Sequence, residues 1–226
     1  MKLSNETMNV LKNFASINQG ILLKQGKVIR TVSSQKTILA QAEIGEEIPV
    51  EFGVYDLNNF LSVVSLHKDD PSFDFDDKHV VIKGNGGRSK IKYRFCDPKM
   101  IVSPPDKDIK MNDPEIVFEL KDSDLDWVLR AASVLGSPQV AVESDGTKIS
   151  LVTFDTSNDS AHTDSLEVAE GNGDTYKMVF KTENLKMIPG TYKVSISSQG
   201  ISNFKNTKVN LQYWIATEQG STFTKS

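Results

Sequence analysis

Amide, hydroxyl and ammonium side chains gather on one face of a predicted helix near the start of the chain. Leu11 and Phe14 recur at helical spacing. The opposite face is polar and carries Asn9, Lys12, Asn13 and Ser16. A second predicted helix has a similar face, made of Asn58, Asn59, Ser62 and Ser65. Two interpretations stay open: the side chains solvate the helices, or they form a surface that faces an anion without gripping it.

A denser cluster of positive charge lies on a predicted strand. Its basic side chains alternate along one side, at Arg88, Lys90, Lys92 and Arg94. Tyr93 and Phe95 point to the other side, whereas a platform for single-stranded nucleic acid has its aromatic and basic side chains on the same face. The pattern therefore favours a solvated sheet face over a nucleic-acid platform.

The residue types that carry most enzyme chemistry show no catalytic spacing. The sequence contains no glycine-rich phosphate loop and no G-x-S-x-G nucleophile motif. Its histidines lack the spacing of zinc ligands and lie at His67, His79 and His162. Cys96 lies in a predicted strand with no histidine close in sequence, which is typical of a small buried hydrophobe. We therefore expect neither an enzyme nor a metal or cofactor site.

These side chains must be positioned by an α+β arrangement of helices on antiparallel sheets. Helices are predicted between Ser4 and Gly20, after Asp56, between Asp122 and Gly136, and over 183–188, where Thr182 is the expected cap. Strand-like runs flank the turns at 84–87 and 144–147, which predicts two hairpins. The first and third helices, and the second and fourth, occupy matching places in the two halves. This order predicts two similar domains with two helices each.

The predicted domains span residues 1–108 and 109–226. Between them lies a proline-bearing segment, residues 97–112. Because proline lacks a backbone N–H and disfavours both helix interiors and central strands, this segment is predicted to be an extended interdomain connector.

The charge balance excludes a protein that grips nucleic acid through a strong overall basic field. The chain has 226 residues, with 26 basic and 30 acidic side chains and a net charge of -4. Up to position 108 there are 15 basic and 14 acidic residues, and 11 and 16 follow. Acidic residues on the helices cluster at their N-termini, so we expect the exposed helix faces to be poor in acid. No signal peptide or membrane span is expected.

Several sequence blocks resemble the sliding clamps of T4-type bacteriophages, the processivity factors of the replicative DNA polymerase. The blocks are MKLS at 1–4, LKNFASINQGI at 11–21, VYDLNNFL at 54–61, LR at 129–130 and LKMIPGTYK at 185–193. The resemblance runs nearly end to end. It implies the DNA-clamp fold, with two similar domains per subunit, a homotrimeric ring, helices lining the hole and sheets outside. It also implies a mobile ring in the cytoplasm of an infected bacterial host.

The resemblance implies roles for particular residues. It places double-stranded DNA next to eight side chains, at Asn9, Lys12, Asn13, Ser16, Asn59, Ser62, Arg130 and Lys186. It also implies an apolar pocket near the connector for hydrophobic tails of partners. The apolar residues available there are Met100, Ile101, Val102, Pro104, Pro105, Ile109 and Met111. The alternative is that these residues only pack the connector onto the domains.

The implied partners are the replicative DNA polymerase, an ATP-dependent clamp loader and late-transcription factors, with no membrane. An alternative from another class is a two-domain β-rich interaction or virion structural protein without a DNA role.

Overall fold

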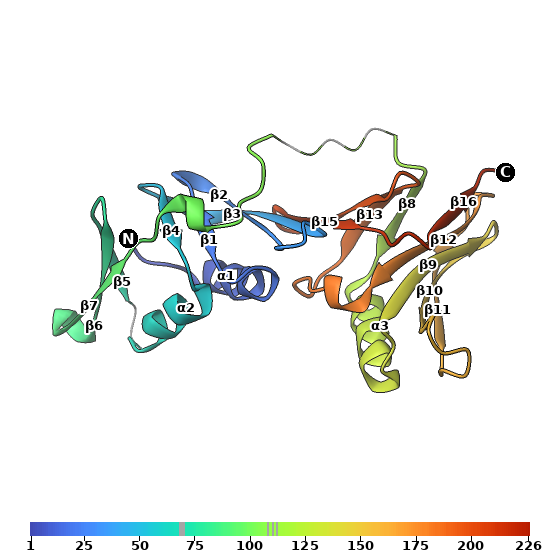
Figure 1. The fold of residues 1–226 in the computed structure, drawn as a ribbon, viewed down its shortest axis with the longest axis horizontal. Helices are drawn as coiled ribbons and strands as arrows, with labels where there is room; N and C mark the ends of the chain where they lie inside the picture. Colours follow the sequence, from blue (N-terminus) through green and yellow to red (C-terminus); the bar gives the residue numbers. More distant parts are fainter. Residues whose placement is uncertain (68–70, 108, 110, 112) are drawn as a thin grey trace. The chain divides into compact units, whose positions relative to one another are not determined.

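The computed structural model describes residues 1–67, 71–107, 109, 111 and 113–226. The chain forms two compact units, Met1–Lys107 (unit 1) and Asp108–Ser226 (unit 2), each built from α-helix and antiparallel sheet (Figure 1). The predicted α+β class is confirmed. The predicted domain limit at residue 108 and connector positions 108, 110 and 112 lie outside the described residues.

Unit 1 places two neighbouring helices beside short antiparallel strands. Helix α1 (Asn5–Ile17) packs next to α2 (Leu57–Ser65) (Figure 1). Strand β1 (Ile21–Leu23) pairs with β4 (Phe52–Val54), and β2 (Gly26–Val32) with β3 (Ile38–Ile48). A three-stranded sheet follows, in the order β5 (Ser72–Phe75), β6 (His79–Gly84) and β7 (Ser89–Arg94). The turn η1 (Asn85–Gly87) joins β6 to β7, which confirms the first predicted hairpin.

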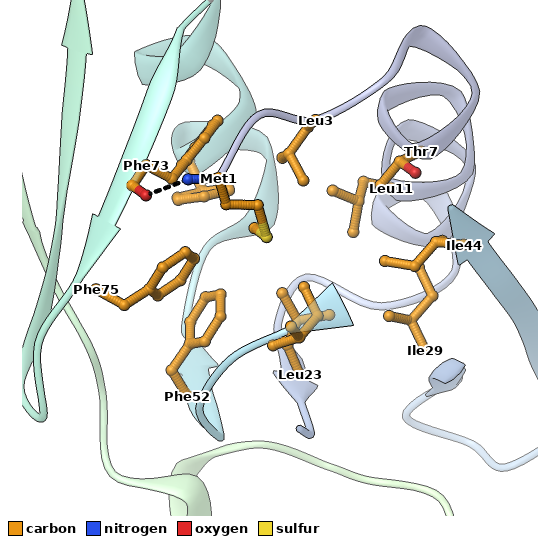
Figure 2. Close-up of a pocket in the computed structure, with 12 residues that line it drawn as sticks. Met1, Leu3, Thr7, Leu11, Leu23, Ile29, Ile44, Phe52, Phe73 and Phe75 are labelled. Atoms are coloured by element: carbon orange, nitrogen blue, oxygen red, sulfur yellow. Dashed lines mark hydrogen bonds between the residues drawn. The ribbon is translucent and has the colours of Figure 1, made fainter. Parts of the chain in front are cut away.

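The core of unit 1 is apolar and closely filled. Figure 2 shows Leu11 of α1 facing Ile29 and Ile44, while Phe52 lies against Phe75 with ring centroids 5.3 Å apart. A remaining cavity of about 10 Å³ has room for at most one water molecule, and its apolar lining offers that water no hydrogen-bond partners. The Met1 amine donates a hydrogen bond to the Phe73 carbonyl at 2.9 Å (Figure 2). Strands β1 to β5 and α1 therefore share one packed interior.

The described residues of unit 2 form one α-helix and two antiparallel sheets. Helix α3 (Asp122–Leu135) packs on a five-stranded sheet in the order β11 (Asp164–Glu170), β10 (Lys148–Phe154), β9 (Gln139–Asp145), β12 (Thr175–Lys181) and β16 (Thr222–Thr224). The pairing of β9 with β10 confirms the second predicted hairpin. A second run of pairs links β15 (Leu211–Ala216), β14 (Ile201–Asn206), β13 (Tyr192–Ser197) and β8 (Ile116–Leu120).

The prediction of a fourth helix over residues 183–188 is wrong. Residues 182–184 form a single 3-10 turn, η3 (Thr182–Asn184), and 185–188 are irregular. The expected cap is absent: no side chain caps the turn, and the Thr182 hydroxyl donates to the Ser137 carbonyl at 2.9 Å. Pro189 disfavours helical geometry at Ile188, so a segment this short cannot continue as α-helix. Among the described residues, unit 2 therefore holds one α-helix rather than two.

Candidate nucleic-acid interface

The polar face of α1 lies on the surface, as its spacing predicts. Ser4 caps the helix by accepting a hydrogen bond from the Thr7 N–H at 3.2 Å. Leu11, Phe14 and Ala15 are buried. The opposite positions Asn9, Lys12 and Ser16 are exposed, and Asn13 is half-buried. The Ser16 hydroxyl donates to the Asn13 carbonyl at 2.6 Å, so it is partly occupied by the helix itself. Lys12 is the positive charge of this face.

Helix α2 adds a face without any charged side chain. Asp56 caps it by accepting from the Asn59 N–H at 2.8 Å, and Asn59 and Ser62 are both exposed. The Ser62 hydroxyl donates to the Asn58 carbonyl at 2.8 Å, a back-bond that serines commonly make within helices. Helices α1 and α2 pack together (Figure 1), and both expose amides and hydroxyls, with Lys12 on α1. We call the exposed residues of α1 and α2 the polar helix surface.

Helix α3 differs from this pattern. Arg130 is exposed, but its guanidinium pairs with the Asp126 carboxylate at 2.7 Å, one turn earlier. The helix also carries Asp122 and Asp124, so its net charge is negative. The expectation that exposed helix faces are poor in acid is therefore wrong for α3. The first acidic side chains do lie at the N-terminus of α3, where the helix dipole stabilises negative charge. Asp126 is a further acidic residue in the second turn.

Lys186 lies outside any helix. It is exposed in the irregular segment after η3 and borders a groove of about 900 Å³ beside the C-terminal half of α3. Leu129, Ser133 and Met187 line the same groove. The structure thus brings Lys186 near the helix that carries Arg130. It places the four predicted residues of α1 and the two of α2 in unit 1, on two helices that pack together.

The connector residues are divided between packing and exposure. The Asn18 side-chain amide donates to the carbonyls of Val32 and Val102, both at 2.9 Å, which ties the connector to β2. The Ile101 side chain fills the space beside Gly20 and Gly53. A Cβ atom added to Gly53 would lie 2.9 Å from that side chain, and one added to Gly20 would lie 3.6 Å from it.

Met100 and Val102 are exposed on the connector, with relative accessibilities of 61% and 43%. Pro105 is also exposed, and the remaining residues are half-buried, namely Pro104, Ile109 and Met111. Lys24 pairs with Asp106, and this hydrogen-bonded ion pair lowers the pKa of the Asp106 carboxyl below its ordinary value.

Sequence reasoning missed Trp127. Its indole N–H donates to an Asp164 carboxylate oxygen at 3.1 Å, and half of the residue is exposed. A tryptophan off the apolar stripe of α3 was the available signal.

Cys96 was expected to be buried and is half-buried. Burial raises the pKa of its thiol, which makes it a weaker nucleophile near neutral pH.

Neither a metal-binding cluster nor a membrane-spanning helix is found in the described part of the chain. No group of three or more His, Cys, Asp or Glu residues in that part of the chain could hold a metal ion. None of the described helices combines the length and apolar character needed to cross a membrane.

Comparisons with known proteins cover both units. Residues 4–103 match the family model for the DNA polymerase processivity factor, and residues 117–219 match that for the gp45 sliding clamp, C terminal. The chain is 39% identical to the sliding clamp of Vibrio phage KVP40, over 96% of this chain and 99% of that one. It is 35% identical to the sliding clamp of Enterobacteria phage T4, over 98% and 99%.

Solved structures of low identity share the fold. A. fulgidus PCNA, bound to the C-terminal region of FEN-1, matches with a TM-score of 0.70 and 15% identity, over 97% of this chain and 95% of that one. PCNA from Thermococcus kodakaraensis matches with a TM-score of 0.68 and 13% identity, over 94% and 96%. The predicted clamp fold is confirmed. The chain therefore belongs to the sliding clamp family of DNA polymerase processivity factors, whose members are not enzymes.

Proposed function

We propose that this clamp closes as a homotrimeric ring around duplex DNA and tethers the replicative DNA polymerase to its template. The polar helix surface is the observation that carries the proposal. Apart from Glu6 in the first turn of α1, it combines one lysine with neutral amides and hydroxyls, so it can face a phosphate backbone without binding it tightly. Affinity and salt dependence both rise with each neutralised phosphate, so a surface with few cations favours sliding over fixation.

The negative net charge of the chain is compatible with a protein that encircles DNA, whereas a protein that binds DNA tightly through phosphate contacts would be basic. Three copies at -4 each would carry -12. A ring retains DNA by topology and therefore needs only enough local positive potential to centre the duplex. In unit 1 we assign the DNA-facing role to Asn9, Lys12, Asn13, Ser16, Asn59 and Ser62. In unit 2 we assign it to Arg130 and Lys186, with Arg130 weakened by its pairing with Asp126.

We further propose that the connector receives hydrophobic tails of partner proteins. The exposed Met100 and Val102 supply apolar surface there, and short apolar anchors are a common peptide-recognition mode. The A. fulgidus clamp with the C-terminal region of FEN-1 bound supports a tail-binding role for this fold. Partners of the same kind would be the polymerase, an ATP-dependent clamp loader and late-transcription factors, in the cytoplasm of an infected bacterium.

Retention on DNA of different topology tests the ring. The protein is loaded by its cognate loader onto nicked circular DNA, and half of the sample is then linearised. We expect the protein to stay on circles and to leave linear DNA, because only a closed contour traps a ring. Light scattering in parallel should give three times the chain mass. Equal retention on both DNAs, or a monomer that never loads, would contradict the ring and favour an interaction or virion protein.

A further inference from the structure

The tripeptide Gly-Asn-Gly occurs twice in the chain, at residues 84–86 and 171–173. The first copy lies in the turn between β6 and β7, and the second in the turn between β11 and β12. When glycine follows asparagine, no Cβ atom crowds the backbone nitrogen that can attack the asparagine side chain. Both asparagines are exposed, so solvent reaches both. Any difference in their chemistry must therefore come from their contacts.

Asn85, in the first copy, has a free side chain. Its backbone carbonyl accepts from Arg88, but its side-chain amide forms no hydrogen bond with any residue that the structure describes. The Gly86 N–H lies in the first turn of η1, where a helix supplies no acceptor, and no described residue accepts a hydrogen bond from it. A Cβ atom added to Gly86 would meet nothing within 4 Å. Both reacting groups are thus unoccupied and surrounded by open space.

Asn172, in the second copy, is held on both sides of its amide. The side-chain nitrogen donates to an Asp174 carboxylate oxygen at 3.0 Å and to the Glu115 carbonyl at 3.4 Å. The side-chain oxygen accepts from the Asp174 N–H at 3.2 Å. The Gly173 N–H donates to the Gly146 carbonyl at 2.9 Å. An attack on this side chain would first have to break these bonds.

Local charge separates the two turns in the same direction. Residues 85–94 contain four basic side chains and no acidic one, and the Arg88 Nε lies 3.5 Å from the Asn85 carbonyl oxygen. Asn172 instead lies next to carboxylates, with Glu170 and Asp174 two positions away on either side. The attacking nitrogen must first lose its proton. Nearby cations stabilise the anion that forms, and nearby carboxylates destabilise it.

We propose that Asn85 is a site of spontaneous deamidation and that Asn172 is protected by its hydrogen bonds. The Gly86 nitrogen gives its proton to hydroxide and bonds to Cγ of Asn85. The Cγ–Nδ2 bond then breaks, and the leaving nitrogen takes up a proton and departs as ammonia. Water opens the resulting cyclic imide at either carbonyl, which yields aspartate or isoaspartate. The sum is one amide and one water converted to a carboxylic acid and ammonia, with no change of oxidation state.

This modification would change both the charge and the backbone of the β6–β7 hairpin. The new carboxylate adds one negative charge to the net -4 of the chain, in a turn where Arg88 is the neighbouring cation. The isoaspartate product also lengthens the main chain by one carbon within η1, between the paired residues Gly84 and Ser89. The hairpin should therefore become less basic and less regular as the protein ages. This inference does not depend on the ring or on its partners.

Rates of deamidation in the folded and the denatured chain test the proposal. The full chain is incubated at mildly alkaline pH, with and without guanidinium chloride, and is digested at intervals. Mass spectrometry then follows the exchange of amide for carboxyl at Asn85 and Asn172, and an isoaspartyl methyltransferase labels the isoaspartate. Dividing the folded rate by the denatured rate of the same site removes the effect of the flanking residues.

We expect this ratio to be near one at Asn85. At Asn172 the folded rate should be at least about tenfold lower than the denatured rate, because its hydrogen bonds must open first. Equal ratios at the two sites would overturn the proposal. A low ratio at Asn85 would also overturn it, because the turn would then protect this asparagine.

Two variants connect the modification to one side chain. Asn85→Gln should remove the acidic form that wild-type protein develops on ion exchange, because glutamine would have to close a larger and slower-forming ring. The matched control is Asn158→Gln, at an exposed asparagine followed by aspartate, and it should leave the acidic form unchanged. An acidic form that accumulates equally in Asn85→Gln would place the reaction elsewhere and overturn the proposal.

Discussion

At the scale of single residues, Glu46 shows how one carboxylate fixes the start of a helix that bears the polar surface. An oxygen of Glu46, on β3, accepts a hydrogen bond from the Thr7 hydroxyl at 2.5 Å, and its other oxygen accepts from the Ser4 N–H. Partial burial raises the pKa of Glu46, but the bonds from Thr7 and Ser4 outweigh it and bring the pKa below its ordinary value of 4.5. A lowered carboxyl pKa means that the ionised form stabilises the fold above the unfolded pKa. This stabilisation is lost as pH falls through the folded pKa.

Glu46→Gln tests this contact. We expect the free energy of unfolding to fall by about 1 kcal/mol at neutral pH, because a charge-assisted hydrogen bond is replaced by a neutral one. The difference from wild type should shrink as the pH is lowered from neutral into acid through the folded pKa, because the wild-type carboxylate then becomes protonated as well. Urea titrations across this range measure it, with Glu47→Gln as the exposed neighbouring control. A difference that is constant with pH would show that the carboxylate charge is irrelevant.

At the scale of elements, the connector is held by few contacts and leaves apolar side chains outside. Asn18 and the Lys24–Asp106 pair fix it to unit 1, and Ile101 occupies space beside Gly53. The turn η2 (Pro98–Met100) begins at the Asp97 cap, whose side chain accepts from the Lys99 N–H at 2.9 Å, and ends with Met100 exposed. A connector docked in this way can offer one apolar side to a partner while the other stays packed.

Ile109→Asp tests the connector as a docking site. We expect the affinity for a peptide from the polymerase C-terminus to fall about tenfold, since apolar anchors in interfaces typically contribute 1 kcal/mol or more. Fluorescence anisotropy of the labelled peptide measures this, and Ser103→Asp places the same charge on an exposed connector position as a control. Unchanged affinity with a lowered melting temperature would assign Ile109 to packing alone.

At the scale of the whole molecule, charge is distributed unevenly between neutral, basic and acidic surfaces. The polar helix surface is nearly neutral, β7 is basic, and α3 and β11 are acidic. A net charge of -4 therefore describes no single surface of this clamp. The proposed ring needs only a weak positive potential at its inner wall, and such a potential is compatible with a negative net charge.

Neutralising the three cations assigned to the DNA-facing set tests whether their charge supports synthesis. Lys12→Gln, Arg130→Gln and Lys186→Gln together should reduce clamp-dependent primer extension several-fold, because the wall loses its attraction for phosphate. Removing Arg130 also leaves the Asp126 charge uncompensated. The sedimentation coefficient should stay that of the wild type, since the three side chains are exposed and their exchange leaves the packed core unchanged. Full extension activity in the triple variant would remove these side chains from the DNA-facing set.

Local pattern was sufficient for the features that depend on neighbours in sequence. Helical spacing and caps placed α1, α2 and α3, and turn residues placed the β6–β7 and β9–β10 hairpins, because these signals act within a few residues. The alternation along β7 likewise predicted which of its side chains are exposed. The fourth helix failed because Pro189 leaves only a short segment after Thr182, whose hydroxyl contacts Ser137 and does not cap the turn.

Sequence alone determined that this chain is an α+β protein with polar helix faces and a basic strand, and its blocks identified the family. Only the tertiary structure decided that the Arg130 charge is paired, that Lys186 lies off any helix, and that β11, missed in the sequence, is an edge strand. Strand order is set by pairing between residues far apart in the chain, so no local pattern reveals which strands are left with a free edge.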